Sequence, residues 1–224
     1  MITVAALYVD PRGPYPSMPG VECWDEQRDA RNYAGPHPVV AHPPCSRWCR
    51  LAKFVESRHG YRVGDDAGCF ASALSAVRRW GGVLEHPAWS LAWGAHNLLE
   101  PRHGRSRLPA RAWARTFDGE WVCELAQSAY GHECSKLTWL LLSGATPPAG
   151  TNWSRPRGRR VIGHMTRRAD GSVFRRNADR INDDRAIHSP PAFAEFLVEL
   201  ARQCRSASNV TSLDSRRKPK GEGK

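Results

Sequence analysis

The stretch GCFASALSAVRRWGGVLEHP, residues 68–87, decides the fold because it joins a helical pattern directly to a buried strand. Apolar side chains recur at every third or fourth position, which predicts a helix over about 67–80 that starts behind the acidic pair 65–66. The apolar run 82–84 follows at once and ends at Glu85. A short apolar run that closes at a polar residue is typical of a strand buried in a parallel sheet.

Two earlier apolar runs have the same character, 3–9 before Asp10 and 39–41 before His42. Together with the helix and the run at 82–84 they form a strand, helix, strand pattern, which indicates an α/β fold. The carboxyl ends of parallel strands meet at one edge of a sheet, and ligands bind there. We therefore expect the functional side chains at the ends of these three runs.

The second half of the chain predicts a hairpin and a closing helix. Extended segments at 120–125 and 137–142 are separated by a Tyr-Gly turn, which is typical of two antiparallel strands. Ser189 is then expected to cap a helix with Pro190 at its first position. The apolar stripe of this helix consists of Phe193, Phe196, Leu197, Leu200 and Ala201.

The chain of 224 residues and 25.0 kDa is long enough for one substantial core. We expect a single domain over 1–204, an Arg-rich excursion outside the core at about 144–188, and a disordered basic tail over 205–224. No stretch approaches the roughly 20 apolar residues that cross a bilayer, and the first residues lack a signal-peptide pattern. A cytoplasmic protein without a membrane partner or an obligate protein partner is the expectation.

The formal charge of +11 is concentrated in three segments. Residues 102–115 carry five Arg and no acid, 155–185 carry a net charge of +6, and 205–224 carry a net charge of +4. Basic loops on a near-neutral body indicate a polyanionic partner, of which nucleic acid is the commonest, although a solubilising surface is the ordinary alternative. The candidate nucleic-acid contacts are Arg47, Arg105, Arg107, Arg157, Arg159 and Arg160.

Cys45 is the candidate nucleophile. It follows two prolines at the end of a predicted strand, where a rigid loop would expose its thiol. Arg47 and Arg50 are close in sequence and would favour the thiolate. A buried cysteine that packs as a small apolar side chain is the structural alternative.

The seven cysteines form no regular pattern, so reduced thiols are expected rather than a disulfide framework. His42, Cys45 and Cys49 lie close together, and a small metal-binding protein that uses these three side chains is one alternative function. Because no CxxC pair occurs anywhere in the chain, we predict no metal site.

Three motifs in order carry a family resemblance: AHPPCSRWCRLA at 41–52, GGVLEHP at 81–87 and AYGHECSKLTWLLL at 129–142. They resemble motifs of the DNA cytosine methyltransferases that act at ring carbon 5. Those enzymes have a PPC loop with the nucleophilic cysteine, a strand ending in an E-N-V-like triplet, and a Tyr-Gly turn before a Q-x-R-x-R-like strand. The layout is also similar to small methyltransferase-like proteins of phages and prophages. The resemblance covers about 35–142, with the helix at 189–204 as the counterpart of the family's closing helix.

The resemblance implies a Rossmann-like methyltransferase-type sheet, mostly parallel with a late antiparallel hairpin. It implies that Cys45 adds to carbon 6 of a flipped cytosine and that Glu85 holds or protonates the ring at N3. Lys136 is the one cation left in the third motif, so it is the third expected catalytic residue. DNA in a bacterial cytoplasm is the implied partner, with a phage or prophage origin.

The implied cofactor is S-adenosylmethionine, and its expected residues are Asp10, Gly13, Asp25 and Pro43. The first strand, however, runs into YVDPRGPY instead of the family's glycine-rich turn, and little sequence remains before Cys45 for a second strand. Two further functions therefore stay open. One is a catalytically silent DNA-binding module of the same fold, and the other is a pyrimidine-modifying enzyme that uses a Cys adduct at carbon 6 with another cofactor.

Overall fold

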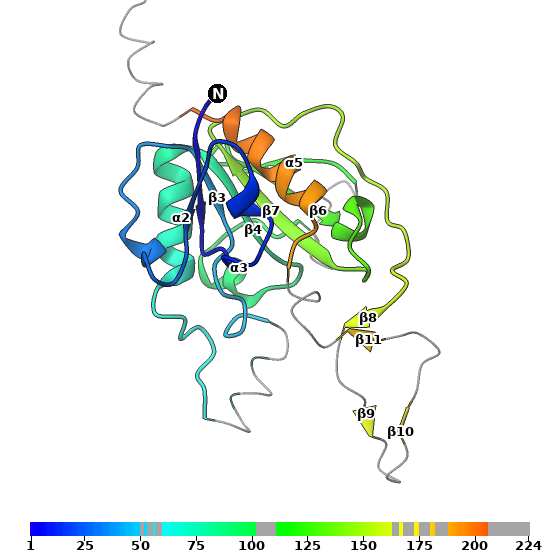
Figure 1. Ribbon diagram of the computed structural model, residues 1–224. Helices are drawn as coiled ribbons and strands as arrows, with labels where there is room; N and C mark the ends of the chain where they lie inside the picture. The colour runs from blue at the N-terminus through cyan, green and yellow to red at the C-terminus, as the bar shows by residue number, and fades with distance from the viewer. Residues whose placement is uncertain are drawn as a thin grey trace, which may run out of the picture.

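The computed structural model describes residues 1–49, 52, 56, 60–101, 111–162, 166–167, 173–174, 180–181 and 188–205. These residues form a seven-stranded sheet in the order β2-β1-β3-β4-β7-β6-β5, with helices on both faces (Figure 1). Strands β2, β1, β3 and β4 are parallel, whereas β7, β6 and β5 pair antiparallel. The expected α/β class is therefore confirmed. The sheet is mixed, with three parallel and three antiparallel strand pairs, where the expectation was a mostly parallel sheet with a late antiparallel hairpin.

In chain order, the elements are β1 (Val4–Leu7), η1 (Tyr15–Ser17), β2 (Val21–Trp24), η2 (Ala30–Asn32), β3 (Val39–Ala41), α2 (Cys69–Trp80), β4 (Gly82–Pro87), α3 (Leu91–Ala95), β5 (Ala114–Arg115), β6 (Trp121–Ala126), η3 (Gln127–Tyr130), β7 (Leu137–Ser143), β8 (Val161–Ile162), β9 (Thr166–Arg167), β10 (Val173–Phe174), β11 (Arg180–Ile181) and α5 (Pro191–Arg202). Among the described residues, strands β8 to β11 form two small sheets apart from the seven-stranded sheet. Ala145 and Trp153, at the start of the segment expected to lie outside the core, pack against the core on the side of α5. None of the helices in the described residues has the length and apolar character needed to cross a membrane.

The core has two layers because side chains alternate between the faces of the sheet. In β1, Ala5 and Leu7 pack on the side of α2, whereas Val4 and Ala6 pack on the side of α5. The predicted stripe of α5 is buried, apart from the half-buried Phe196. Figure 1 shows α2 and α5 on opposite sides of the sheet. The functional edge is thus held by a sheet that is covered on both faces.

Gly82 allows β4 to approach β3 closely. Its φ of +140° is in a region that favours glycine, and a Cβ at this position would overlap the backbone of Val39. The register pairs Gly82 with Val39 and Leu84 with Ala41, so both strands end at the same edge. Glu85 is thereby carried to the level of the loop that follows β3.

Several boundaries differ from the prediction, and three of them have a clear local cause. Helix α2 begins at Cys69 because Ala67 and Gly68 have positive φ values of +55° and +78°. Strand β4 continues to Pro87, since β7 pairs with it as far as Thr138. Helix α5 begins at Pro191, one residue later than expected, with Pro190 as its N-cap.

The second strand, for which the sequence left little room, is present. β2 pairs in parallel with β1 at the edge of the sheet and ends directly before Asp25. The connection is short because it contains only the single turn η1. The predicted disorder of 205–224 lies outside the described residues beyond Arg205.

Candidate active site

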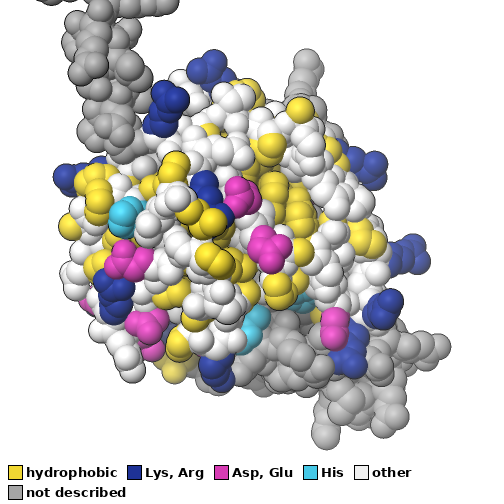
Figure 2. Space-filling model, turned by 45° about the horizontal axis from the view of Figure 1, so that its top comes forward, with side chains coloured by type: hydrophobic (Ala, Val, Ile, Leu, Met, Phe, Trp, Pro, Cys, Tyr) yellow, Lys and Arg dark blue, Asp and Glu magenta, His cyan; other side chains and the backbone are white. Residues whose placement is uncertain are grey.

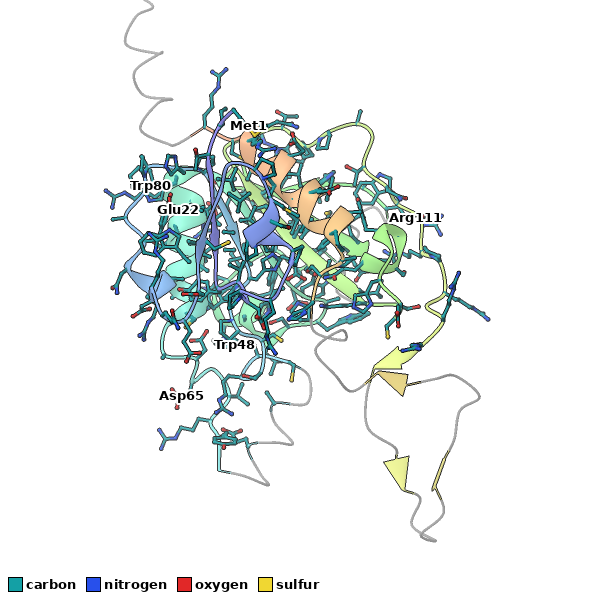
Figure 3. All side chains as sticks on the ribbon, viewed as in Figure 1. Met1, Glu22, Trp48, Asp65, Trp80 and Arg111 are labelled. Atoms are coloured by element: carbon teal, nitrogen blue, oxygen red, sulfur yellow. The ribbon has the colours of Figure 1, made fainter. Side chains whose placement is uncertain are left out.

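A first cavity of about 590 Å³ opens at the carboxyl ends of β1, β3 and β4. Its wall includes Asp10 after β1, Cys45 after β3 and Glu85 within β4. The prediction that these three residues line one cleft is confirmed, while their chemical roles stay predictions. In Figure 3 this end of the sheet is marked by Trp48, at the opposite end from Met1.

Cys45 begins a tight turn after the two prolines. Its carbonyl oxygen accepts hydrogen bonds from the backbone N–H groups of Trp48 and Cys49, both at 2.9 Å. The cysteine is only partly exposed, so its thiol lines the first cavity without projecting into open solvent. The loop therefore presents Cys45 to a ligand that enters the cavity.

Burial raises the pKa of the Cys45 thiol, and the nearby Glu85 and Cys49 raise it further. Lys136 acts in the opposite direction with a smaller effect. Cys45 is therefore a protonated thiol at neutral pH in the protein alone. Formation of the thiolate requires a change at the site, such as the arrival of a ligand that alters the surrounding charge.

The expectation that basic sequence neighbours favour the thiolate is wrong for Arg47. Its guanidinium lies 3.9 Å from the ring centroid of Tyr61, in a cation–π contact. The other predicted neighbour, Arg50, lies outside the described residues. The cation that faces Cys45 is Lys136, which lies far away in the sequence.

Glu85 is held on both of its oxygens. Oε1 accepts a hydrogen bond from Gln127 Nε2 at 3.1 Å and another from the hydroxyl of Thr138. Oε2 lies 2.9 Å from His42 Nδ1. Burial alone would raise the pKa of Glu85, but the hydrogen bond and charge of His42, together with Lys136, lower it to about 2. Glu85 is therefore a carboxylate at neutral pH.

His42 is connected to a buried tyrosine on its other side. Tyr15 Oη, on η1, lies 2.5 Å from His42 Nε2, and Tyr15 is only 3% exposed. Burial, followed by the charge of Glu85, raises the pKa of Tyr15 well above its usual range, so the hydroxyl keeps its proton. With neutral His42, the hydroxyl donates to Nε2 and Nδ1–H donates to Glu85. The result is a continuous hydrogen-bonded row of Tyr15, His42 and Glu85.

Lys136, the third predicted catalytic residue, lines the same cavity from the loop before β7. Burial lowers its pKa, while the charges of Glu85 and Cys45 raise it. The structure thus brings Cys45, Glu85 and Lys136 together. They come from three separate loops or strands of the sheet.

A second cavity of about 920 Å³ lies at the ends of β1 and β2. Of the residues expected to bind the cofactor, Asp25, directly after β2, lines this second cavity, Asp10 lines both, and Gly13 and Pro43 line the first. The wall that the two cavities have in common consists of Tyr8, Val9, Asp10 and Pro44. A ligand in one cavity therefore lies next to a ligand in the other.

The charge of the second cavity fits S-adenosylmethionine, which carries a sulfonium, an ammonium and one carboxylate. Two of its acids are paired: Asp10 with Arg12 at 2.8 Å and Asp29 with Arg31 at 2.7 Å. Asp25 and the adjacent Glu26 add further negative charge to the lining. A net positive ligand with ribose hydroxyls suits such carboxylates.

Residues 151–160, which we name the strap, lie against the loop that forms one wall of the first cavity. The Gly158 N–H donates to Ser135 Oγ at 2.8 Å, and the Arg160 N–H donates to the carbonyl oxygen of Glu133 at 3.1 Å. A Cβ on Gly158 would overlap the backbone of this loop, so the close approach requires glycine. Because Ser135 itself lines the cavity, the strap lies beside its wall.

The predicted nucleic-acid arginines have different surroundings. Arg157 and Arg159 on the strap are exposed and make no ion pair among the described residues, whereas Arg160 pairs with Glu133 at 3.3 Å. On the face drawn in Figure 2, which brings the opposite end of the sheet forward, Lys and Arg are scattered among acidic and apolar side chains. The remaining candidates of the basic loop, Arg105 and Arg107, lie outside the described residues.

The alternative of a metal site at His42, Cys45 and Cys49 is not supported. Across the part of the chain that the structure describes, no three His, Cys, Asp or Glu side chains are grouped to hold a metal ion. His42 instead lies between Tyr15 and Glu85. The Cys49 thiol contacts its own turn, 3.8 Å from the Ser46 carbonyl oxygen.

Sequence reasoning missed the residues that hold the carboxylate. Tyr15 and Gln127 belong to short 3₁₀ turns without periodicity, and Thr138 stands where the family motif has an arginine. The sequence placed His42 among the functional candidates at the strand ends, but the specific role that it suggested there was that of a metal ligand. No protein-family model, curated protein or solved structure matches this chain.

Proposed function

We propose that the protein methylates carbon 5 of cytosine in DNA, with Cys45 as the nucleophile and S-adenosylmethionine as the methyl donor. One observation carries this proposal: Cys45, Glu85 and Lys136 line one cavity that has a wall in common with a second, acidic cavity. The cytoplasm of a bacterial host, where DNA and this cofactor are both present, is the compartment that the proposal implies. A phage or prophage origin accords with the sequence resemblance.

The three residues suit the chemical problem of this reaction. Carbon 5 of an aromatic pyrimidine is a poor nucleophile until a thiolate at carbon 6 interrupts the ring. Cys45 would make that bond, and Lys136 would favour the thiolate by its charge. Glu85 would hold the edge of the ring and, when it carries a proton, donate it to N3, where negative charge develops as the sulfur adds.

The second cavity supports the choice of cofactor. S-adenosylmethionine would supply the methyl group as an electrophile. Asp25 would bind the ribose hydroxyls, because it directly follows the second strand. Asp10, which is fixed by Arg12 and by His188 at 3.2 Å, would keep the common wall in place between the two ligands. Gly13 and Pro43 would shape the side that holds the base.

The arrangement of the sheet supports the resemblance to the methyltransferases, and the strap supports DNA as the substrate. A parallel half followed by an antiparallel hairpin is the arrangement that the resemblance implies. A base in a duplex must be flipped out before a side chain can reach its ring, and the flanking phosphates then need positive partners. Arg157 and Arg159, beside the first cavity, would supply them. These features favour a base within a strand over a free nucleotide.

The proposal is tested by transfer of a labelled methyl group from S-adenosylmethionine to DNA, with the labelled base identified as 5-methylcytosine. The wild-type protein should transfer label, Cys45→Ser should transfer none, and Cys49→Ser should retain most activity as a matched control in the same turn. Transfer by Cys45→Ser would overturn the nucleophile. A wild-type protein that binds both DNA and cofactor without transfer would instead be the silent module.

A further inference from the structure

We propose that His42, fixed between Tyr15 and Glu85, holds the proton that reaches N3 of the cytosine through Glu85 Oε2. This inference rests on the proposed function. It makes His42 a positioning and proton-holding residue, because it acts on the base through Glu85. The proposal is carried by the hydrogen-bond geometry around the carboxylate.

The two carboxylate oxygens of Glu85 differ in how many further hydrogen bonds they can accept. A carboxylate oxygen accepts about two hydrogen bonds. Oε1 is already flanked by Gln127 Nε2 and by the Thr138 hydroxyl, which also lies 2.9 Å from the His86 carbonyl oxygen, so these two side chains occupy the space around it. Oε2 has a single partner, His42 Nδ1, at 2.9 Å. The substrate therefore meets Oε2, the same oxygen that His42 contacts.

Glu85 needs an external source of protons. Burial raises the pKa of Glu85, but the hydrogen bond and the charge of His42 outweigh it and lower the pKa to about 2. The carboxyl group is therefore protonated in only about one molecule in 10⁵ at pH 7. Among the described residues, the charged or titratable groups that interact with it are His42, Lys136, Tyr15, Cys45 and His86. Burial lowers the pKa of His86 to about 4, so its ring holds no extra proton at pH 7. Tyr15 contacts Glu85 only through His42 and keeps its proton, and Cys45 is the nucleophile. His42 is the candidate with a direct hydrogen bond to Oε2.

The proton transfer starts from the Cys45 thiolate, whose proton has passed to water, and from there it balances without a further reactant. As the Cys45 thiolate bonds to carbon 6, the C5=C6 electron pair moves to C4–C5, and the C4=N3 pair moves onto N3. N3 takes a proton from Oε2, and Oε2 takes the Nδ1 proton of the His42 imidazolium. His42 becomes neutral with hydrogen on Nε2, Glu85 is again a carboxylate, and the adduct is neutral.

Tyr15 fits this cycle because a hydroxyl can donate or accept. It donates to Nε2 when that nitrogen is bare, and it accepts when Nε2 carries hydrogen. The ring of His42 can therefore keep one orientation, with Nδ1 toward Glu85, in both protonation states. Phenylalanine at this position would fill the same space without holding Nε2.

The test uses exchange of the carbon 5 hydrogen with water, because this exchange needs the thiol adduct and the N3 proton but no cofactor. Full-length protein is incubated with duplex DNA whose cytosine is tritiated at carbon 5. His42→Asn keeps an N–H donor for Oε2 but holds no extra proton. We expect at least a tenfold loss at pH 7 relative to the wild-type protein. This loss should shrink as the pH falls, because Glu85 is then protonated directly more often, while the ionisation of Cys45 affects both proteins alike.

Matched variants separate the possible outcomes. His37→Asn makes the same substitution outside both cavities and should leave the rate unchanged. A wild-type rate and pH profile in His42→Asn would overturn the inference. The inference would also be overturned if Lys136→Met showed the pH profile that is expected for His42→Asn. Absence of exchange in the wild-type protein would overturn the proposed function instead. If His42→Asn fails to fold, Tyr15→Phe decides: a severalfold loss supports the inference and an unchanged rate overturns it.

Discussion

Replacing Arg157 and Arg159 with alanine should weaken DNA binding and flatten its dependence on salt. Each phosphate contact of a protein on duplex DNA contributes about 0.9 to the slope of log affinity against log salt concentration. Of the strap arginines, Arg155 pairs with the buried Glu124 at 2.9 Å and Arg160 pairs with Glu133. Only the two exposed arginines are left to contact phosphate, so the slope should decrease by about 1.8.

The assay is fluorescence anisotropy of a labelled duplex, titrated with protein at several salt concentrations between about 50 and 200 mM. Arg79→Ala is the matched control, because this exposed arginine lies near the end of α2, away from the sheet edge that holds the cavity. It should leave the slope unchanged. An unchanged slope in the double variant would mean that Arg157 and Arg159 are ordinary solvated surface, and the strap would have no part in binding.

Three further predictions concern buried groups. His86 is 0% exposed. Burial lowers its pKa and outweighs the opposite effect of Glu85, so the pKa is about 4 and the ring is neutral in the folded protein at neutral pH. In the unfolded chain the His86 ring takes up a proton below about pH 6.5. The free energy of unfolding, measured with urea, should therefore fall by about 3 kcal/mol between pH 6.5 and 4, and the variant His86→Phe should lack this part of the pH dependence. Arg155→Met removes the ion pair of the buried Glu124, which still accepts a hydrogen bond from Trp139 Nε1 at 3.1 Å, and should lower the stability by about 1 to 3 kcal/mol, a loss that a second change to Gln at Glu124 should partly restore in the same urea assay. Glu85→Gln keeps the shape of the side chain but removes its charge, so methyl transfer should fall at least 100-fold, with a melting temperature that shows a folded protein. Wild-type transfer by this variant would exclude the carboxylate from the reaction.

The positions of the predicted catalytic residues could be inferred from the sequence because they depend on one strong rule. Short apolar runs locate buried parallel strands, and such strands end at a common edge. Asp10, Cys45 and Glu85 follow or end these runs, and they line one cavity. No knowledge of the turns between the strands was needed for this inference.

The edge strand and the supporting network could not be inferred in the same way. The residues of β2 are all half-buried, so their sequence shows neither a continuous apolar run nor a clear alternation. Tyr15 is brought to His42 by the local path of η1, which has no periodic signal. Contacts of this kind depend on packing between segments that are distant in the sequence.

The protonation state of Cys45 shows the same limit. Counting charges along the chain favoured a thiolate, because Arg47 is only two positions away. In the folded protein burial and the charge of Glu85 both raise the pKa of Cys45, and the charge of Lys136 lowers it by less. A pKa depends on distance in space and on desolvation, neither of which the local sequence contains.

The central claim is that the Cys45 sulfur bonds to carbon 6 of a cytosine. The most direct measurement is the mass of the protein after incubation with S-adenosylmethionine and a duplex that contains 5-fluorocytosine, followed by mapping of the modified peptide. Fluorine at carbon 5 cannot leave as a proton does, so the adduct should persist. The account predicts one adduct, on the peptide that contains Cys45, formed equally by Cys49→Ser and absent from Cys45→Ser. An adduct on Cys49, or none while DNA and cofactor are both bound, would contradict it.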